Sequence, residues 1–227
     1  MILPGISLFG TVALSGEDSR HIFGALRMRE GDTLILCDGN GLEARCVLTA
    51  DGHAAVKETF PSKGEFSRPV HIYPSVSKGE RFEWMLQKAT ELGASTITPV
   101  LSQRCISTGI SKGKRERCQK ILRSAAEQSI RGRIPLLLDV LPFEQAVKEA
   151  PGLRIFCYED ERTVSLREAL SDGEISVMTG PEGGYTPEEA RLAADNGWRS
   201  VSLGKTVLRC ETAPLMVLSA VKFISMY

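Results

Sequence analysis

An arginine and a carboxylate stand two residues apart in a glycine-bearing segment near the end of the chain. The segment reads LGKTVLRCETA over residues 203–213 and contains Arg209 and Glu211. A second such segment, GPEGGY over residues 180–185, precedes it. A guanidinium can hold an oxygen anion, and glycines let the backbone approach a ligand closely. The two segments together are typical of a small-molecule site beside a charge-stabilising residue.

Both segments follow short apolar runs and lead into helix signals. The runs Ile175–Thr179 and Ser200–Leu203 are expected to be strands. Thr186, Pro187 and Glu189 form the N-cap, first position and capping box of the helix that follows the first segment. Ligands of α/β proteins bind at the C-terminal ends of strands. Neither G-x-G-x-x-G nor G-x-x-x-x-G-K-[ST] occurs, which favours a nucleoside-type cofactor over a nucleoside triphosphate or a dinucleotide.

The rest of the chain after residue 67 alternates between strand and helix patterns. This alternation predicts a parallel sheet with helices on both faces. Further strands are expected at Val70–Ser75, Thr96–Leu101, Ile134–Leu138 and Arg154–Tyr158, and helices at Glu80–Leu92 (closed by Gly93), Arg115–Arg131, Phe143–Ala150, Ser165–Leu170 and Ala213–Ile224.

Residues 1–66 have a different, mostly β pattern that predicts a small barrel. Glu17–Arg29 has a helical pattern with Ile22, Leu26 and Phe23 on one face. The turn Gly39-Asn40-Gly41 indicates a hairpin. The strands are expected at Thr33–Asp38, Glu43–Leu48 and His53–Thr59, and a linker at Pro61–Glu65. We therefore predict two domains, 1–66 and 67–227.

Charge is unevenly distributed in a chain whose formal net charge is zero. Residues 67–135 contain 13 Lys and Arg against 5 Asp and Glu, while both flanks are acidic. A basic tract suits a phosphate backbone, although a solvated helix face is an equally good interpretation. The tract is densest in Arg104, Lys112, Lys114, Arg115, Arg117, Lys120, Arg123, Arg131 and Arg133.

Other classes of protein are disfavoured by simple patterns. The six cysteines form no C-x-x-C pair, so we expect free thiols in a reducing cytoplasm and no metal site or disulfide framework. The apolar run Ala213–Val221 is too short to span a bilayer, and the N-terminus lacks the basic region of a signal peptide.

The motifs, taken in order, resemble one family of RNA methyltransferases. They are H-I-x-x-x-L-R at 21–27, K-G-E-R with Q-K-A-T-E-L-G at 78–93, A-A-E-Q-S at 125–129, G-P-E-G-G at 180–184, and L-G with L-R-x-E-T-A at 203–213. This order resembles the SPOUT class, and within it the bacterial small-subunit rRNA (uracil-N3)-methyltransferases of the RsmE type. The chain departs from the family pattern at Cys210, where threonine is usual, and at Lys205 and Thr206.

The resemblance implies a fold, a cofactor and partners. It implies a SPOUT domain with a deep trefoil knot, preceded by a PUA-like RNA-binding barrel. The implied activity is transfer of the methyl group of S-adenosylmethionine to N3 of a uracil in 16S rRNA, free or in the small ribosomal subunit, by a cytoplasmic homodimer. Two alternatives stay open: a SPOUT methyltransferase with another RNA target, and a non-catalytic RNA-binding assembly protein.

The resemblance also implies roles for individual residues. Arg209 is expected to stabilise charge as uracil N3 loses its proton, the alternative being a structural ion pair with Glu211. Glu211 is either a base or a loop anchor, and covalent catalysis by Cys210 is disfavoured because methyl transfer to N3 needs no enzyme nucleophile. The cofactor is expected to contact Tyr158, Thr179, Gly180, Pro181, Glu182, Gly183, Leu203, Gly204, Leu208, Cys210, Thr212 and Ala213.

RNA contacts are expected from both domains. In the first domain, His21 could equally be structural. In the second, Gln128 and Arg131 could face the RNA, the active site or only the solvent, and Lys88 with Glu91 is expected to be a simple i, i+3 pair. The expected RNA-binding residues are Arg20, His21, Arg27, Lys78, Arg104, Lys112, Lys114, Arg115, Gln128 and Arg131.

Overall fold

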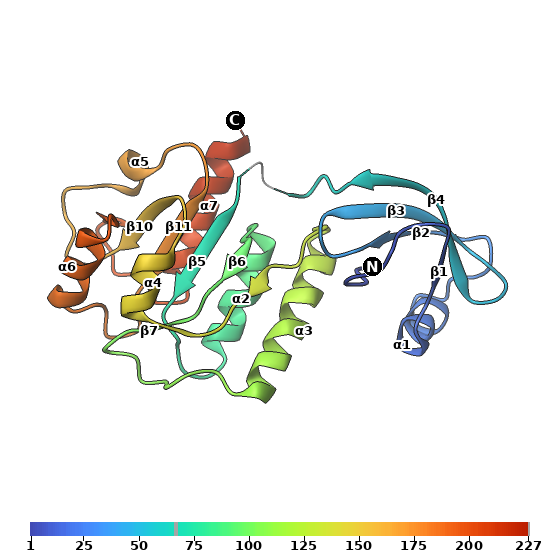
Figure 1. Cartoon of the computed structure of the whole chain (residues 1–227), viewed down its shortest axis with the longest axis horizontal. Helices are drawn as coiled ribbons and strands as arrows, with labels where there is room; N and C mark the ends of the chain where they lie inside the picture. Colours follow the sequence, from blue (N-terminus) through green and yellow to red (C-terminus); the bar gives the residue numbers. More distant parts are fainter. Residues whose placement is uncertain (66–67, 227) are drawn as a thin grey trace. The chain divides into compact units, whose positions relative to one another are not determined.

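The chain divides into two compact units in the computed structural model, which describes residues 1–65 and 68–226 (Figure 1). Unit 1 consists of Met1–Glu65 and Ala126–Ile134, and unit 2 of Phe66–Ala125 and Pro135–Tyr227. The domain boundary expected between residues 66 and 67 lies outside the described residues. Residues 126–134 thus belong to unit 1 although they follow the first segment of unit 2 in the sequence. A single boundary along the sequence cannot describe this division.

Unit 1 contains a four-stranded antiparallel sheet in the order β1-β4-β3-β2. The predicted hairpin turn lies between β2 and β3, where Gly39 and Gly41 have φ of +78° and +100°. The sequence predicts a barrel, whereas β1 and β2 do not pair with each other in the described part of the sheet. The strands are β1 (Thr11–Ala13), β2 (Thr33–Cys37), β3 (Leu42–Leu48) and β4 (His53–Pro61).

The helical segment of unit 1 differs from the prediction. It consists of α1 (Gly16–Ser19) and the π-helical turn η1 (Arg20–Ala25), rather than one α-helix to residue 29. Ile22 is fully buried as expected, but Leu26 is 53% exposed. The expectation for Leu26 was wrong because the π turn widens the spacing and the helix ends before residue 26, so the i, i+4 relation to Ile22 is lost.

Unit 2 is built on a six-stranded sheet in the order β12-β10-β11-β5-β6-β8, in which every neighbouring pair is parallel. The strand predicted over Thr96–Leu101 is divided into β6 (Thr96–Ile97) and β7 (Val100–Leu101), and β7 pairs with β9 (Leu141–Pro142) in a separate sheet. Pro99, between them, has no amide N–H to continue the ladder. The other strands are β5 (Val70–Pro74), β8 (Leu136–Leu137), β10 (Leu153–Cys157), β11 (Ile175–Thr179) and β12 (Arg199–Val201).

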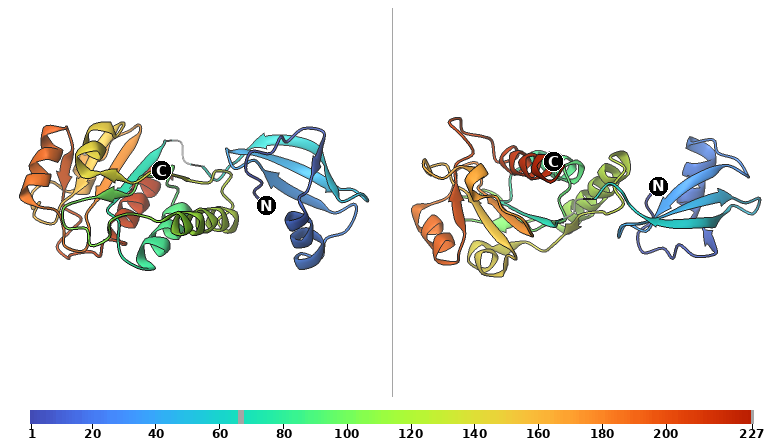
Figure 2. Two further views of the ribbon diagram at one scale, coloured as in Figure 1. Left: turned by 60° about the horizontal axis from the view of Figure 1, so that its bottom comes forward. Right: turned by 90° about the horizontal axis from the view of Figure 1, so that it is seen from above.

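Helices cover both faces of this sheet, as predicted (Figure 2). On one face α7 packs against β5, β11 and α2, and on the other α4 and α6 pack together, α6 also contacting β12. The helices of the chain after residue 67 are α2 (Arg81–Glu91), α3 (Lys112–Gln128), α4 (Phe143–Glu149), α5 (Leu166–Ala169), α6 (Pro187–Asp195) and α7 (Ala213–Met226).

The segment GPEGGY ends at Tyr185, which belongs to a buried aromatic cluster. The ring centre of Tyr185 lies 4.4 Å from that of Phe156 and 5.5 Å from that of Phe143. Directly after Tyr185, the hydroxyl of Thr186 accepts a hydrogen bond from the amide of Glu189, which completes the predicted capping box of α6. The segment is therefore anchored on a packed core at one end and a capped helix at the other.

Candidate active site

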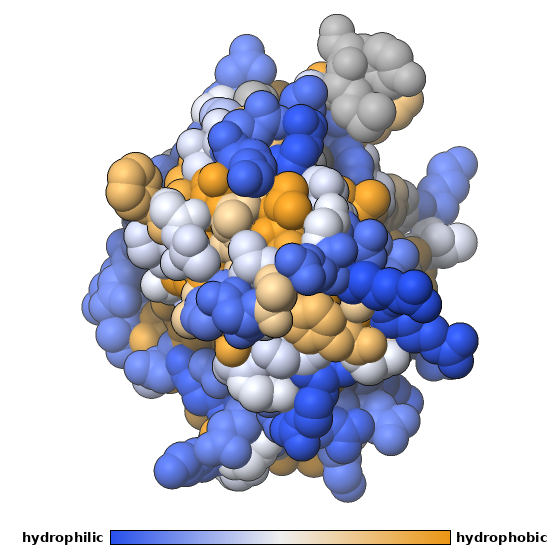
Figure 3. All heavy atoms as spheres, turned by 90° about the vertical axis from the view of Figure 1, so that its right-hand side faces the viewer, coloured by the Kyte–Doolittle hydropathy of each residue, from blue (hydrophilic) through white to orange (hydrophobic). Residues whose placement is uncertain are grey.

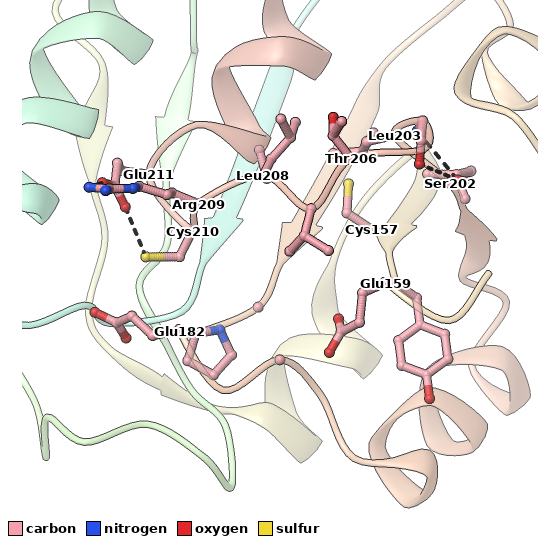
Figure 4. A pocket seen from close by; sticks show the side chains of 18 of the residues that line it. Cys157, Glu159, Glu182, Ser202, Leu203, Thr206, Leu208, Arg209, Cys210 and Glu211 are labelled. Carbon is pink, nitrogen blue, oxygen red and sulfur yellow. Dashed lines mark hydrogen bonds and ion pairs between the residues drawn. The ribbon is translucent and has the colours of Figure 1, made fainter. Parts of the chain in front are cut away.

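A cavity of about 620 Å³ opens at the C-terminal ends of β10, β11 and β12 (Figure 4). Its walls come mainly from residues 157–159, 180–184 and 201–211. This volume is within the range of small-molecule sites. The two glycine-bearing segments picked out in the sequence therefore meet at one cavity.

Ten of the twelve residues expected at the cofactor line this cavity. Thr179 and Thr212 do not. Thr179 is buried at the end of β11, where its carbonyl accepts a hydrogen bond of 2.9 Å from the amide of Ser75. The amide of Thr212 donates to the carbonyl of Arg209 at 2.9 Å, ahead of α7. The residues that line the cavity are Tyr158, Gly180, Pro181, Glu182, Gly183, Leu203, Gly204, Leu208, Cys210 and Ala213.

Several lining residues were not predicted from the sequence. Arg81 lies in the K-G-E-R motif, which was used for the resemblance but given no role. Glu159 is the second residue after the strand β10, and a carboxylate so close to the C-terminal end of a predicted strand could have been recognised in the sequence. The lining residues without an assigned role are Arg81, Cys157, Glu159, Arg162, Gly184, Val201, Ser202, Lys205, Thr206 and Val207.

The Arg209 guanidinium lies beside the Glu211 carboxylate on one side of the cavity (Figure 4). Their Nη1 and Oε1 atoms are 3.9 Å apart, and the Arg209 side chain is 77% exposed against 11% for Glu211. Partial burial would by itself raise the pKa of Glu211, but its own backbone amide, the Cys210 thiol and the positive charges of Arg81 and Arg209 lower that pKa below its usual value. Glu211 is thus ionised at neutral pH and leaves most of Arg209 available to a ligand.

The Cys210 thiol acts as a hydrogen-bond donor in this site. Its Sγ lies 3.2 Å from Oε2 of Glu211. Burial, and then the hydrogen bond to Glu211, raise the pKa of the thiol to about 12, and the nearby Glu182 carboxylate adds to the effect. A thiol that keeps its proton at neutral pH is a poor nucleophile, which agrees with the expectation that Cys210 takes no covalent part.

An ion pair connects the glycine segment to α2. Nη1 of Arg81 lies 3.5 Å from Oε1 of Glu182, and the two side chains are 51% and 25% exposed. The cavity therefore presents cationic groups from Arg81 and Arg209 and anionic groups from Glu182, Glu211 and, on the opposite wall, Glu159 (Figure 4). A ligand with charges of both signs suits such a lining.

Three of the basic residues expected at RNA bind other parts of their own unit. Arg131 is 5% exposed and its Nη2 lies 2.7 Å from a carboxylate oxygen of Glu65. Arg115 donates to the carbonyls of Leu137 and Leu138 at 2.8 and 3.1 Å. Arg104 donates to carbonyls of the segment 183–185. Some of the positively charged side chains in residues 67–135 therefore form contacts within the fold.

The other expected RNA residues lie closer to the surface. Arg20, His21 and Arg27 are exposed on and after η1 in unit 1. Hydrophilic and apolar residues lie next to each other on the face of the molecule drawn in Figure 3. Lys78, Lys112 and Gln128 are exposed as well. Lys114 is half-buried, and its Nζ lies 5.6 Å from the ring centre of Phe82. Lys88 and Glu91 form the predicted i, i+3 pair at 2.7 Å.

Two further features concern ligands and membranes. Within residues 1–65 and 68–226, no three His, Cys, Asp or Glu side chains are grouped so that they could hold a metal ion. Over the same residues, no helix is long and apolar enough to cross a membrane.

Family models match most of the chain. Residues 64–222 match a model described as an RNA methyltransferase domain, and residues 14–58 match one described as an RNA methyltransferase PUA domain. The chain is 34% identical to a ribosomal RNA small subunit methyltransferase E of Bacillus subtilis, with 94% of this chain and 90% of that protein covered. It is also 34% identical to the protein of the same name from Mycobacterium tuberculosis, with 93% and 86% covered.

Solved structures resemble this chain over almost its full length. A ribosomal RNA small subunit methyltransferase E from Neisseria gonorrhoeae, bound to S-adenosylmethionine, matches with a TM-score of 0.88, 33% identity, and 99% and 96% of the two chains covered. A putative methyltransferase from Legionella pneumophila in complex with the same cofactor matches with a TM-score of 0.86, 30% identity, and 99% and 96% covered.

Proposed function

Because the chain belongs to the RNA methyltransferase family, among the ribosomal RNA small subunit methyltransferases E, we propose that it methylates N3 of a uracil in small-subunit ribosomal RNA, with S-adenosylmethionine as the methyl donor. One observation carries this proposal. The segments 180–184 and 203–211 meet at a single cavity with Arg209 at its side. Action on ribosomal RNA, as a free molecule or in the small subunit, also means that the protein works in the cytoplasm.

The cavity suits this cofactor in shape and in charge. S-adenosylmethionine supplies a methyl group that is already activated by the positive sulfur, so the protein must mainly bind and orient. In this proposal, main-chain groups of Gly180, Gly183, Leu203, Gly204 and Leu208 hold the adenosine part, since a glycine-rich wall allows close approach. Ionised side chains of both signs then bind the charged ends of the methionine part.

Arg209 and Glu211 have different roles in the proposed mechanism. The N3 position of uracil must lose its proton, which leaves negative charge on the ring. The exposed guanidinium of Arg209 binds and stabilises that charge. Glu211 is a weak base because its pKa lies below the usual value, so it positions Arg209 and does not take the proton.

The RNA surface in this proposal uses the exposed basic residues and not the internally paired ones. Arg20, His21 and Arg27 of unit 1 are exposed and lie within the PUA match. In unit 2 Lys78 and Lys112 are exposed. Phosphate contacts of this kind supply affinity without sequence specificity.

A homodimer and a knotted C-terminal chain complete the proposal. Met216, Phe223 and Ile224 of α7 are 40%, 67% and 46% exposed, and their spacing places them on one face of the helix. Such an apolar face suits a second copy of the chain. The knot is proposed from the family resemblance; the chain leaves the sheet edge at β12 and continues into α7, which packs on the more central strands β5 and β11.

The proposed reaction can be tested on ribosomal RNA from a bacterium that lacks this activity. Small subunits and free 16S rRNA are incubated with the protein and S-adenosylmethionine, and the nucleosides are analysed by mass spectrometry. We expect N3-methyluridine to appear in the small-subunit RNA. Methylation of another RNA or another atom would move the protein to a different target, and cofactor binding without any methylation would indicate a non-catalytic RNA-binding protein.

A further inference from the structure

The turn Ser102–Cys105 packs against the C-terminal end of the sheet in unit 2. The hydroxyl of Ser102 lies 3.2 Å from that of Ser75, which follows β5. The amide of Cys105 donates to the carbonyl of Ser102 at 3.0 Å, and its thiol reaches the carbonyl of Val100 at 3.7 Å. The turn is thus fixed to β5 and β7, and β5 pairs with β11, at whose C-terminal end the candidate active site opens.

The other side of this turn holds the glycine segment of the active site. Nη1 of Arg104 donates to the carbonyl of Gly183 at 2.8 Å and to that of Tyr185 at 3.3 Å. The neighbouring amide of Gln103 donates to Oε1 of Glu189 at 2.8 Å. One guanidinium nitrogen therefore joins two carbonyls that are two residues apart in the segment.

These two carbonyls belong to peptide groups whose amides are also bonded. The carbonyl of Gly183 shares its peptide plane with the amide of Gly184, which donates to the carbonyl of Pro181 at 3.0 Å. The carbonyl of Tyr185 shares its plane with the amide of Thr186, which donates to the Glu189 carboxylate at 2.9 Å. In each peptide group, both the carbonyl and the amide are therefore hydrogen-bonded, and Arg104 is the donor to both carbonyls.

The stem of Arg104 also packs closely over the segment. A Cβ atom added to Gly183 would lie 3.3 Å from Cβ of Arg104. Gly183 therefore leaves room for the arginine to lie across the loop. The contact is made by the apolar part of the side chain, as is usual for arginines that bury the stem and expose part of the head.

We propose that Arg104 is a positioning residue for the cofactor, because it holds the segment Gly183–Tyr185 in the conformation that lines the cavity. This proposal rests on the proposed place of S-adenosylmethionine between the two glycine segments. It replaces the role suggested by the basic tract, in which Arg104 binds an RNA phosphate. A guanidinium that is committed to two carbonyls has less to offer a phosphate.

The test compares cofactor binding with RNA binding. Arg104→Met keeps the apolar stem over Gly183 and removes the donors, and Lys112→Met serves as the matched control from the same basic tract. By calorimetry, Arg104→Met is expected to weaken S-adenosylmethionine binding ~10-fold while the salt dependence of RNA binding stays unchanged. Lys112→Met is expected to leave cofactor affinity unchanged and to weaken RNA binding. The magnitude of the slope of log K against log salt should fall by about 1.

A rescue experiment separates positioning from general stability. Arg104→Ala is expected to regain cofactor affinity when millimolar guanidinium is added, which a loss of folded protein would not do. Unchanged cofactor affinity in Arg104→Met together with a lower salt slope would overturn the proposal and make Arg104 a phosphate contact. Gly180→Ala distinguishes a wrong role for Arg104 from a wrong cofactor site. If Gly180→Ala also leaves cofactor affinity unchanged, the cofactor does not bind in this cavity.

Discussion

At the scale of single residues, one side of the candidate site consists of a mostly exposed arginine beside two side chains that are hydrogen-bonded to each other. Arg209 is mostly exposed, Glu211 is mostly buried, and Cys210 donates to Glu211. Cys210 occupies a position at which the RsmE-type methyltransferases usually have threonine. Both side chains present a donor at a similar position, so the substitution keeps the hydrogen bond although a thiol is the weaker donor.

Arg209→Ala should separate catalysis from cofactor binding. Since the guanidinium is expected to stabilise charge that develops on the uracil, methyl transfer should fall by about 100-fold. Cofactor affinity, measured by calorimetry, should stay within a few fold because the main chain of the loop is unchanged. Arg209→Lys keeps the charge and should lose less activity. Normal methyl transfer in the alanine variant would contradict the role of Arg209.

Cys210 should behave as a protonated thiol in the folded protein. Its pKa of about 12 means that the thiolate forms only well above neutral pH, so iodoacetamide should modify Cys210 slowly at pH 7.5. Cys210→Thr should retain methyl transfer, since a hydroxyl replaces the donor to Glu211, whereas Cys210→Ala should reduce it. Peptide mapping after alkylation measures the first expectation. Rapid, stoichiometric modification of Cys210 in the native protein would argue that the thiolate is accessible.

At the scale of elements, the active site depends on a short segment held between a core and a helix. Tyr185 anchors the end of the segment in the aromatic cluster, and the Thr186 capping box starts α6 directly afterwards. Gly180 touches this anchor, because a Cβ added there would lie 3.2 Å from the Tyr185 ring. The ring is fully packed and has little freedom to move.

Gly180→Ala should therefore weaken cofactor binding with little effect on the rest of the fold. We expect a loss of ~10-fold in S-adenosylmethionine affinity, because the loop must shift away from the Tyr185 ring. As a control, Gly113→Ala adds a methyl group to open space in α3 and should leave cofactor affinity unchanged. Equal affinities in the wild type and Gly180→Ala would show that the segment does not need this close approach.

Removing the cap of α6 tests stability rather than binding. Thr186→Ala should cost about 1 kcal/mol of folding free energy, or a fall in Tm of about 2–4 °C for a chain of this size. Thr186→Ser keeps the hydroxyl and should remain close to the wild type. Thermal unfolding followed by circular dichroism measures both. An unchanged Tm in Thr186→Ala would mean that the Glu189 carboxylate alone is sufficient at this helix start.

The elements were predictable from the sequence because their signals are local. Thr186, Pro187 and Glu189 marked the start of α6, and Gly93 marked the end of α2. The partners of the arginines were not predictable, because Arg104 binds carbonyls 79 and 81 residues away along the chain and the buried Arg131 binds Glu65. A basic tract in sequence therefore overstates the charge that is free for RNA. Arg81 was missed for the same reason, since its place at the cavity follows from the packing of α2.

At the scale of the whole molecule, the chain combines a region that matches a PUA domain with a parallel-sheet methyltransferase domain, and we propose that it pairs with a second copy. The proposed interface is the apolar face of α7, whose Phe223 is 67% exposed. An exposed apolar face of a helix is unfavourable in water unless a partner covers it. The same helix directly follows the segment that carries Arg209, so dimerisation would also support the active site.

Phe223→Asp should disrupt the dimer, because a buried unpaired carboxylate is costly at an interface. Light scattering should give twice the chain mass for the wild type and for the conservative Phe223→Leu variant, and the monomer mass for Phe223→Asp. The monomer should also lose methyl transfer if the second copy supports the site. A wild type that is monomeric at all concentrations would remove the dimer from the account.

The cofactor position is the most direct test of the whole account, and a crystal structure of the protein with S-adenosylmethionine would reveal it. We predict adenosine held by the main chain of the segments 180–184 and 203–208, with the activated methyl group facing the side of the cavity where Arg209 lies. Density for the cofactor at any other place, or an empty cavity at a saturating concentration, would contradict the account.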